Sequence, residues 1–251
     1  MTGAAIAVAT STTLMTAAAT PFSYSGDELD ALADAENYYR SILRTFAPHL
    51  GEHVVEVGAG TGTFASYLLQ VPGVRRLTLI EPAENNFPTL ERRYGADARV
   101  SIRKGYLDVF APTLRADALV AVNVLEHVER DVDFLRDARR VLTPAGRLLL
   151  FVPATPAIFG TLDRAFEHYR RYTKRALTER LRQAGFDVHT ARYVNLPGVV
   201  SWFLAGRVLR KRTITRRDVR LYDRLVTPWV AWLDRRIEPP VGQSLVAVAT
   251  P

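Results

Sequence analysis

The chain reads His53-Val54-Val55-Glu56-Val57-Gly58-Ala59-Gly60-Thr61-Gly62-Thr63 at the place that decides its fold. A short β-branched run precedes three glycines at alternate positions, a pattern typical of a buried strand that enters a tight turn and opens a helix. Glycine accepts positive φ and lacks a Cβ, so such a turn can approach a ligand closely. The first N–H groups of the following helix lack partners within it and favour a negatively charged ligand group.

Strand-like and helix-like segments alternate along the rest of the chain. This alternation predicts an α/β fold with a doubly wound, mostly parallel sheet, in which ligands bind outside the carboxyl ends of the strands. Residues 26–251 are expected to form one domain. The predicted strands are 54–57, 77–80, 100–103, 118–122, 148–152, 186–193 and 244–249, and the predicted helices are 27–49, 63–70, 87–93, 133–142, 174–184 and a long helical stretch at 198–237.

Composition excludes several kinds of site. The 251 residues include no cysteine, which rules out disulfides, thiolate metal sites and cysteine nucleophiles. The five histidines show no paired H-x-x-x-H spacing, so no metal site is expected. The formal charge of +7 suggests a phosphorylated substrate, a nucleic acid or a membrane surface as partner, or simply a solvated basic surface.

The N-terminal residues look like a tail. Residues 1–25 are rich in Ala and Thr but lack the basic start of a signal peptide, and they are expected to be flexible. No stretch reaches the roughly 18 apolar residues of a membrane-spanning helix. A cytoplasmic location is therefore expected.

Polar side chains follow the predicted strands. Glu81 ends the second strand, nineteen residues beyond Gly62, where an acid can accept hydrogen bonds from both ribose hydroxyls of a nucleoside. A dinucleotide fingerprint would need a third glycine at Thr63, so the nucleoside is of another kind. Further polar segments are Gly105-Tyr106-Leu107-Asp108 and Asn123-Val124-Leu125-Glu126-His127-Val128.

Three of these motifs together resemble the class I S-adenosylmethionine-dependent methyltransferases that act on small molecules, in the type 11 and type 12-like group. They are the E-x-G-x-G-x-G pattern from Glu56, Glu81-Pro82, and the Asn123 to Val128 segment. The resemblance covers most of the chain. It implies a Rossmann-like seven-stranded sheet with an antiparallel last strand, an N-terminal helix that closes over the cofactor, and a helical insertion at 198–238 before the last strand.

The resemblance also implies the cofactor contacts. Gly58, Gly60 and Gly62 would form the loop beside the methionine part of S-adenosylmethionine. Glu81 would accept hydrogen bonds from the ribose hydroxyls, and Asn123 would lie near the transferable methyl. The implied contacts are Tyr38, Glu56, Gly58, Ala59, Gly60, Gly62, Glu81, Pro82, Leu107, Asp108, Asn123, Val124 and His127.

One position departs from the family pattern. Many members carry an acid after the glycine equivalent to Gly105, where it meets the adenine amino group, but this chain has Tyr106. Asp108, which with Leu107 would flank the adenine, or backbone groups are the alternatives.

The acceptor pocket is expected after the fifth strand. Glu167 or His168 is the predicted general base, with Tyr169 beside them. The alternative is that His168 only fixes the loop and that the neighbouring arginines are solvated. The predicted acceptor-binding residues are Arg170, Arg171, Tyr172, Trp202 and Phe203.

The insertion at 198–238 combines apolar residues with ten basic and four acidic ones, a net charge of +6. It could be a lid over the acceptor, a subunit interface, or a basic amphipathic surface in peripheral contact with a membrane. A lid with apolar walls suits an acceptor with an apolar body and an anionic head, such as a prenyl diphosphate, and only a diphosphate would call for Mg²⁺.

Other functions stay open at this stage. Within enzymes, the alternative is O- or N-methylation of an aromatic, sugar or peptide natural product in bacterial secondary metabolism. Nucleic-acid methylation is disfavoured because Asn123-Val124-Leu125-Glu126 replaces the N-P-P-Y or D-P-P-Y motif. An inactive binding module that keeps the cofactor fold is disfavoured by the intact glycine pattern. The sequence does not indicate an oligomeric state.

Overall fold

A computed structural model describes residues 23–24 and 28–251, and it is built on a seven-stranded sheet in the order β3-β2-β1-β4-β5-β7-β6. The first five strands are mutually parallel, and β7 runs antiparallel to both of its neighbours. This confirms the predicted Rossmann-like fold. The strands are β1 (His53–Val57), β2 (Arg76–Glu81), β3 (Val100–Lys104), β4 (Ala116–Val122), β5 (Leu142–Pro153), β6 (Asp187–Val194) and β7 (Ser244–Thr250).

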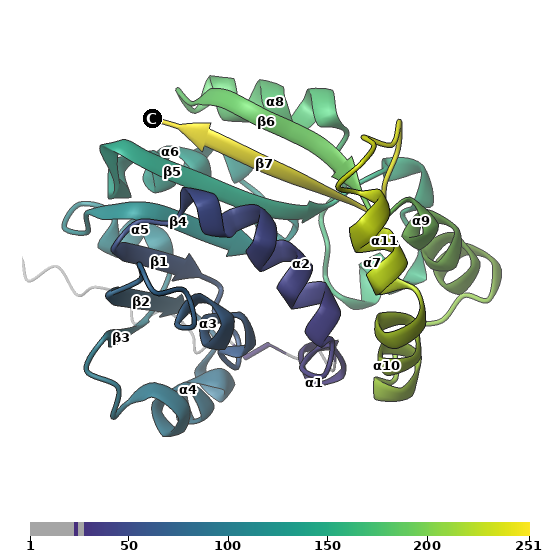
Figure 1. The fold of residues 1–251 in the computed structure, drawn as a ribbon, viewed down its shortest axis with the longest axis horizontal. Coiled ribbons are helices and arrows are strands. Elements are labelled where there is room, and N and C mark those ends of the chain that lie inside the picture. Colours follow the sequence, from purple (N-terminus) through teal and green to yellow (C-terminus); the bar gives the residue numbers. More distant parts are fainter. Residues whose placement is uncertain (1–22, 25–27) are drawn as a thin grey trace, which may run out of the picture.

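Helices cover both faces of the sheet (Figure 1). One face packs against α2 (Glu36–Phe46), α3 (Thr63–Leu68) and α4 (Phe87–Tyr94). The other packs against α5 (Leu107–Phe110), α6 (Asp131–Val141) and α8 (Lys174–Gln183). Burial on both faces explains why the central strands are almost continuously apolar.

The glycine turn after β1 is bound to the neighbouring strand. The N–H groups of Gly58 and Ala59 donate to the carbonyl oxygen of Ile80, at 2.8 and 3.2 Å. Gly62 has a φ of +79° at the start of α3, and a Cβ there would lie 2.4 Å from the ring of Tyr94. Both its conformation and its packing therefore require glycine.

The N-terminal helix is interrupted, which the sequence did not predict. Instead of one helix over 27–49, the described residues form α1 (Glu28–Leu32), α2 and a 3₁₀ turn at Ala47–His49. Asp223, far along the chain, caps α2 by accepting hydrogen bonds from the backbone N–H groups of Asn37 (3.0 Å) and Tyr38 (2.8 Å). A helix start that depends on a residue 185 positions away has no local sequence signal.

The insertion is also divided into several shorter helices, where one long helical stretch was predicted. It contains α9 (Leu196–Phe203), a π-helical turn at Leu204–Val208, α10 (Arg216–Leu225) and α11 (Thr227–Leu233). Thr215 caps α10 by accepting a hydrogen bond from the N–H of Asp218 at 3.1 Å, and Pro228 stands in the first turn of α11. With α7 (Thr161–Ala165), these helices stand at the carboxyl ends of the parallel strands (Figure 1).

One strand is longer than predicted. β5 begins at Leu142, directly after α6. It includes Pro144 and Gly146, which lie between the predicted helix 133–142 and the predicted strand 148–152. The pairing shifts between Ala116 and Ala118 of β4, which lie opposite Leu142 and Arg147, so the extra residues of β5 form an irregularity there.

The cap formed by Asp223 predicts a stability effect. Asp223→Ala should lower the free energy of unfolding in urea by about 1–2 kcal/mol, because it leaves two partly buried N–H groups at the start of α2 without their partner. Asp34→Ala is the matched control, since it breaks an exposed ion pair with Arg220, which lies on α10 like Asp223. The loss of this pair should cost about 0.5 kcal/mol or less. Equal losses in the two variants would contradict the capping role.

Candidate functional site

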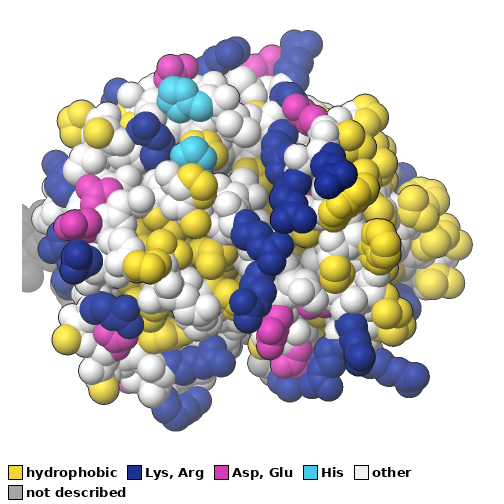
Figure 2. All heavy atoms as spheres, in the orientation of Figure 1, with side chains coloured by type: hydrophobic (Ala, Val, Ile, Leu, Met, Phe, Trp, Pro, Cys, Tyr) yellow, Lys and Arg dark blue, Asp and Glu magenta, His cyan; other side chains and the backbone are white. Residues whose placement is uncertain are grey.

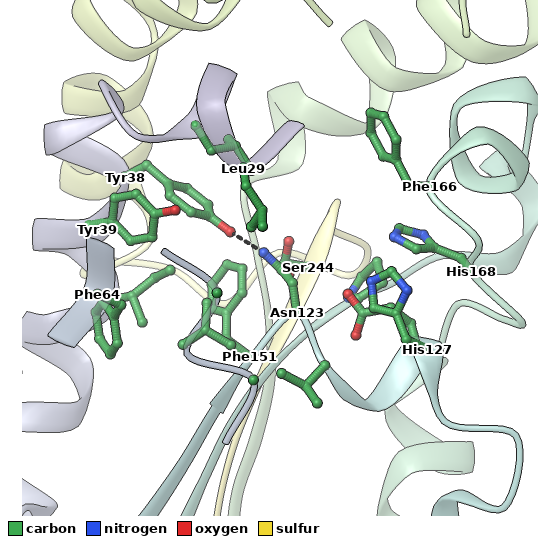
Figure 3. Close-up of a pocket in the computed structure, with 18 of the residues that line it drawn as sticks. Leu29, Tyr38, Tyr39, Phe64, Asn123, His127, Phe151, Phe166, His168 and Ser244 are labelled. Atoms are coloured by element: carbon green, nitrogen blue, oxygen red, sulfur yellow. Dashed lines mark hydrogen bonds between the residues drawn. The ribbon is translucent and has the colours of Figure 1, made fainter. Parts of the chain in front are cut away.

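A cavity of about 1600 Å³ opens at the carboxyl ends of the strands. Its walls come from the glycine turn, α2, the loop after β4, residues 164–169 and the insertion. Hydrophobic side chains line a hollow on this face of the molecule, with Lys and Arg side chains beside it (Figure 2). Figure 3 shows Tyr38 and Tyr39 on one side of the cavity and His127 and His168 on the other.

Glu81 is fixed at the edge of the glycine turn. Its Oε2 accepts a hydrogen bond from the N–H of Gly60 at 2.7 Å, and its Oε1 accepts one from the N–H of Ala83 at 2.9 Å. Burial raises the pKa of this carboxyl, and the hydrogen bonds oppose the rise. The Asn86 side-chain amide also donates to Oε1, at 3.4 Å. Oε2 keeps a further lone pair, so a ribose hydroxyl could still donate to it. Pro82 lines the cavity beside it.

Glu56 lies under the same turn with much weaker support. Only 4% of the residue is exposed, and its Oε2 has no hydrogen-bond partner within the described part of the chain. Burial, together with the charge of Glu81, raises the pKa of Glu56 to about 8. The protonated form is therefore favoured near neutral pH.

The N-terminal helices close over the cavity. The Asn123 side-chain amide donates to the hydroxyl of Tyr38 at 2.8 Å, which joins α2 to the end of β4 (Figure 3). Asn123 has a φ of +52°, an uncommon conformation that this contact helps to hold. Val124 packs beneath Gly58, where an added Cβ would lie 2.6 Å from its methyl group.

The adenine-side residues also line the cavity. Leu107 is buried, whereas Asp108 and Tyr106 are exposed at the start of α5. Of the implied cofactor contacts, Gly62 alone does not line the cavity, because it packs against Tyr94 instead.

On the opposite wall, a fully buried acid, Asp163, organises the loop after β5. It accepts hydrogen bonds from Nδ1 of His168 (3.1 Å) and Nε of Arg171 (2.5 Å), and from the indole N–H of Trp202 (3.0 Å). Burial opposes ionisation of Asp163, but these hydrogen bonds and the Arg171 charge outweigh it and lower its pKa to about 2. The carboxylate thus ties the insertion to the loop.

Three of the predicted acceptor-binding residues, Arg170, Tyr172 and Phe203, do not reach the cavity. Arg170 pairs with the buried carboxylate of Asp131 at 2.7 Å, and the Tyr172 hydroxyl donates to the same group at 2.9 Å. Neither residue lines the cavity, nor does Phe203, whose side chain faces solvent. The buried carboxylate of Asp131 needs charged or hydrogen-bonding partners, and Arg170 and Tyr172 supply them.

The other predicted acceptor residues do reach the cavity. Trp202 lines it, and so does Arg171, although the Arg171 side chain is only 1% exposed and stacks over the Trp202 ring at 4.8 Å. Arg171 therefore positions the wall, and its guanidinium is committed to Asp163.

The three predicted catalytic residues line the cavity in different ways. Glu167 and Tyr169 are exposed at its rim, whereas the His168 side chain is 8% exposed and is oriented by Asp163. Only His168 therefore has the fixed, buried setting expected of a group that acts on a bound acceptor.

Tyr24 lies within the predicted tail but contacts the site. Its backbone and the side chain of Asn85 exchange two hydrogen bonds of 3.0 Å, and its ring meets that of His127 edge-on at 5.7 Å. The predicted flexible tail is otherwise outside the described part of the chain, which leaves out residues 1–22 and 25.

Sequence reasoning missed two groups on this wall, Asp163 and Glu126. Glu126 is completely buried beside His127 and His168, and burial raises its pKa to about 7. Burial and the neighbouring His168 lower the pKa of His127 to about 3. His127 and His168 are 41 positions apart, so spacing could not reveal the cluster.

Comparison with known proteins identifies related chains. A family model described as "Methyltransferase domain" matches residues 31–191. A probable S-adenosylmethionine-dependent methyltransferase of Mycolicibacterium smegmatis is 31% identical over 141 residues, which cover 55% of this chain and 53% of the relative. A ubiquinone/menaquinone biosynthesis C-methyltransferase of Rubrivivax gelatinosus is 29% identical over 119 residues, which cover 47% and 46%. The chain thus spans about half the length of these two curated relatives.

Solved structures share the fold. An S-adenosylmethionine-dependent methyltransferase from Mesorhizobium loti superposes with a TM-score of 0.58 at 15% identity, covering 89% of this chain and all of that one. A putative methyltransferase in complex with the Haloferax volcanii Trm112 activator gives a TM-score of 0.61 at 17% identity, covering 89% and 97%.

The raised pKa of Glu56 predicts a pH dependence of stability. Between about pH 4.5 and 8 the unfolded chain loses a proton that the folded chain keeps, so stability falls as pH rises and levels off above 8. Urea unfolding at pH 5 and pH 8 should show a loss that is larger in the wild type than in Glu56→Gln by roughly 3–5 kcal/mol. Glu52→Gln, at an exposed acid just before β1, should behave like the wild type. A Glu56→Gln variant with the wild-type pH dependence would contradict the assignment.

Proposed function

The chain belongs to the methyltransferase domain family, as a class I S-adenosylmethionine-dependent methyltransferase domain. On this premise we propose that it methylates a small molecule with an apolar body and an anionic head. S-Adenosylmethionine would occupy the glycine-turn side of the cavity, and the acceptor would occupy the side of the insertion.

The shape and lining of the acceptor side carry this proposal. The insertion contributes Trp202, Val230 and Ala231 to the cavity, which suits an apolar body. The exposed basic side chains of Arg164, Lys211 and Arg235 also line it, and they suit an anionic head at its mouth. These groups replace Arg170, whose guanidinium is held by Asp131.

The reacting atoms would meet between two walls. Because the sulfonium methyl is already activated, transfer requires an acceptor atom held about 3–3.5 Å from it and in line with sulfur. Asn123 and Tyr38 stand on the donor side and His168 on the acceptor side (Figure 3). A hydroxyl or carbon acid must also lose a proton, and Asp163 orients His168 for contact with such an acceptor.

The outer surface of the insertion favours a lipid-like acceptor. The exposed apolar residues over α9 to α11 lie among the basic side chains of the insertion (Figure 2). None of the helices in the described ranges is long and apolar enough to cross a bilayer, so contact through this surface would be peripheral. The apolar residues are Val200, Phe203, Leu204, Val208, Leu209, Leu221, Leu225, Trp229, Trp232 and Ile237.

A prenyl diphosphate is the acceptor that combines these features most simply, and its methylation on carbon is the first reaction to test. One relative's name places it in quinone biosynthesis as a C-methyltransferase, which supports a lipophilic acceptor for this chain. O- or N-methylation of a natural product is the alternative, and its acceptor would not need the basic rim.

The basic rim predicts an effect on acceptor binding. With prenyl diphosphates of several lengths and S-adenosylmethionine, mass spectrometry should detect a product heavier by one methylene. Arg235→Glu should raise the acceptor KM at least tenfold, because it places a negative charge at the mouth, and should leave kcat within about twofold. Arg182→Glu, at an exposed residue of α8 away from the cavity, is the control.

Two outcomes would contradict the proposal. Methylation of uncharged aromatic or sugar acceptors, but of no prenyl diphosphate, would favour the alternative. Calorimetry that detects no binding of S-adenosylmethionine would favour an inactive binding module.

The insertion surface predicts binding to anionic membranes. The full chain should float with vesicles that contain phosphatidylglycerol but not with pure phosphatidylcholine vesicles, and salt should weaken the binding. The double variant Trp229→Ser/Trp232→Ser should lower the bound fraction at least tenfold, since Trp229 is 73% exposed. Val109→Ser, at an apolar residue of α5 whose exposure lies between those of the two tryptophans, is the control. Flotation that the tryptophan changes leave unaltered would remove this surface from the proposal.

A further inference from the structure

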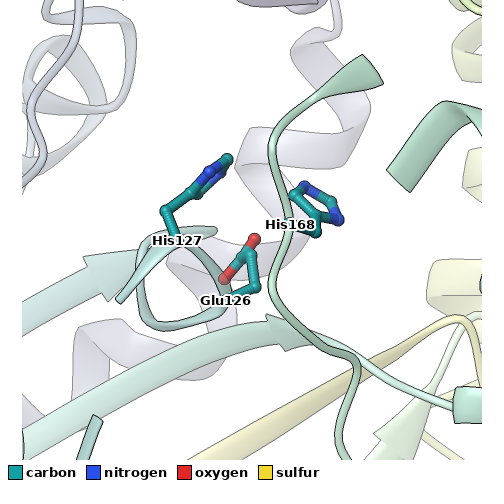
Figure 4. A group of neighbouring side chains, drawn as sticks. All are labelled: Glu126, His127 and His168. Carbon is teal, nitrogen blue, oxygen red and sulfur yellow. The ribbon is translucent and has the colours of Figure 1, made fainter. Parts of the chain in front are cut away.

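We propose that Glu126, His127 and His168 form a binding site for a divalent transition-metal ion on the cavity wall. One ligand atom from each residue lies within 4.8 Å of the others. Glu126 and His127 follow β4, and His168 comes from the segment after α7 (Figure 4). All three residues line the cavity.

The strongest sign of a missing partner is Glu126. Its side chain is completely buried, and neither carboxylate oxygen has a hydrogen-bond partner among the described residues. Placing a carboxylate in such a setting is costly unless it is paired or coordinates a metal. A cation held between Glu126 and the two imidazoles would supply the partner that the protein does not.

Both histidine rings are held in place by neighbouring side chains, and His168 has the outer contact that is common in metal-binding histidines. Nδ1 of His168 lies 3.1 Å from Asp163, and because a carboxylate only accepts, this nitrogen carries the proton and Nε2 keeps its lone pair. A carboxylate or a backbone carbonyl commonly fixes the second nitrogen of a metal-binding histidine in this way. The ring of His127 is held edge-on between the rings of Tyr24, at 5.7 Å, and His168, at 4.8 Å.

The donor set indicates the kind of ion. Two imidazole nitrogens and one carboxylate suit a first-row transition metal, whereas Mg²⁺ and Ca²⁺ prefer oxygen ligands alone. Ligand atoms bound at about 2.1 Å in a tetrahedral site lie roughly 3.4 Å apart, so the three donors would move inward by roughly 1 Å. Three protein ligands would leave at least one coordination position open toward the cavity.

The open position suggests a use in catalysis. An acceptor oxygen bound there would lie on the acceptor side of the cavity, opposite Asn123 and Tyr38 (Figure 3). With the ion bound, Nε2 of His168 is a ligand and no longer a base, so the ion in place of His168 would favour loss of the acceptor proton. This use rests on the proposed function, but binding of the ion does not.

The site can be tested without donor or acceptor. The full chain is treated with a chelator, dialysed and titrated with Co²⁺, followed by visible absorption and calorimetry. We expect one ion per chain, with d–d bands typical of nitrogen and oxygen ligands, and displacement by Zn²⁺. Glu126→Gln and His168→Asn should each weaken Co²⁺ binding at least 100-fold, and Asp163→Asn by about 10- to 100-fold.

Matched controls separate the site from general binding. Glu129→Gln changes another acid that lines the cavity, and His189→Asn changes a histidine on β6 that contacts Thr250. Both should bind Co²⁺ like the wild type. Glu126→Gln keeps the size of the side chain and removes a buried charge, so it should fold and still bind S-adenosylmethionine.

Two results would overturn the metal site. They are the absence of Co²⁺ and Zn²⁺ binding below millimolar concentrations, and equal affinity in Glu126→Gln and the wild type. If prenyl diphosphates are not methylated but Co²⁺ binds as expected, only the acceptor assignment fails. If the acceptor is methylated by metal-free protein and Co²⁺ does not bind, only the metal site fails.

Discussion

The glycine turn after β1 is held to β2 by its own backbone, and the cavity depends on this attachment. The N–H groups of Gly58 and Ala59 donate to Ile80, and that of Gly60 donates to the carboxylate of Glu81. These bonds bring the end of β1, the start of α3 and the acid after β2 to one edge of the sheet. Because β1, β2 and β4 are mutually parallel, Asn123 at the end of β4 lies at the same edge.

The opposite wall depends on buried carboxylates. Asp163 joins His168, Arg171 and Trp202, and so connects the loop after β5 to the insertion. Asp131 holds Arg170 and Tyr172 in the same manner, away from the cavity. A row of residues that looks like an acceptor site in the sequence is therefore largely a scaffold. It leaves His168 as the polar side chain oriented toward Glu126 and His127.

The N-terminal helices and the insertion form one cover over the cavity. Asp223 of α10 caps α2, Arg220 pairs with Asp34 before α2, and Tyr38 of α2 binds Asn123. Elements from both ends of the chain are thus linked to the donor side of the site. Movement of the insertion to admit an acceptor would affect the helix that covers the cofactor.

The sequence by itself determined the alternation of strands and helices and the glycine turn, because these follow from local backbone requirements. Alternating apolar periods predict strands and helices, positive φ restricts Gly62 to glycine, and Glu81 follows at the spacing set by one βαβ unit. The interrupted N-terminal helix and the inward-facing arginines were not predictable in this way. Only the tertiary structure decided the partners of Asp223, Asp163 and Glu126. The partner of a long polar side chain depends on burial and on distance in space, and local sequence spacing does not encode either quantity.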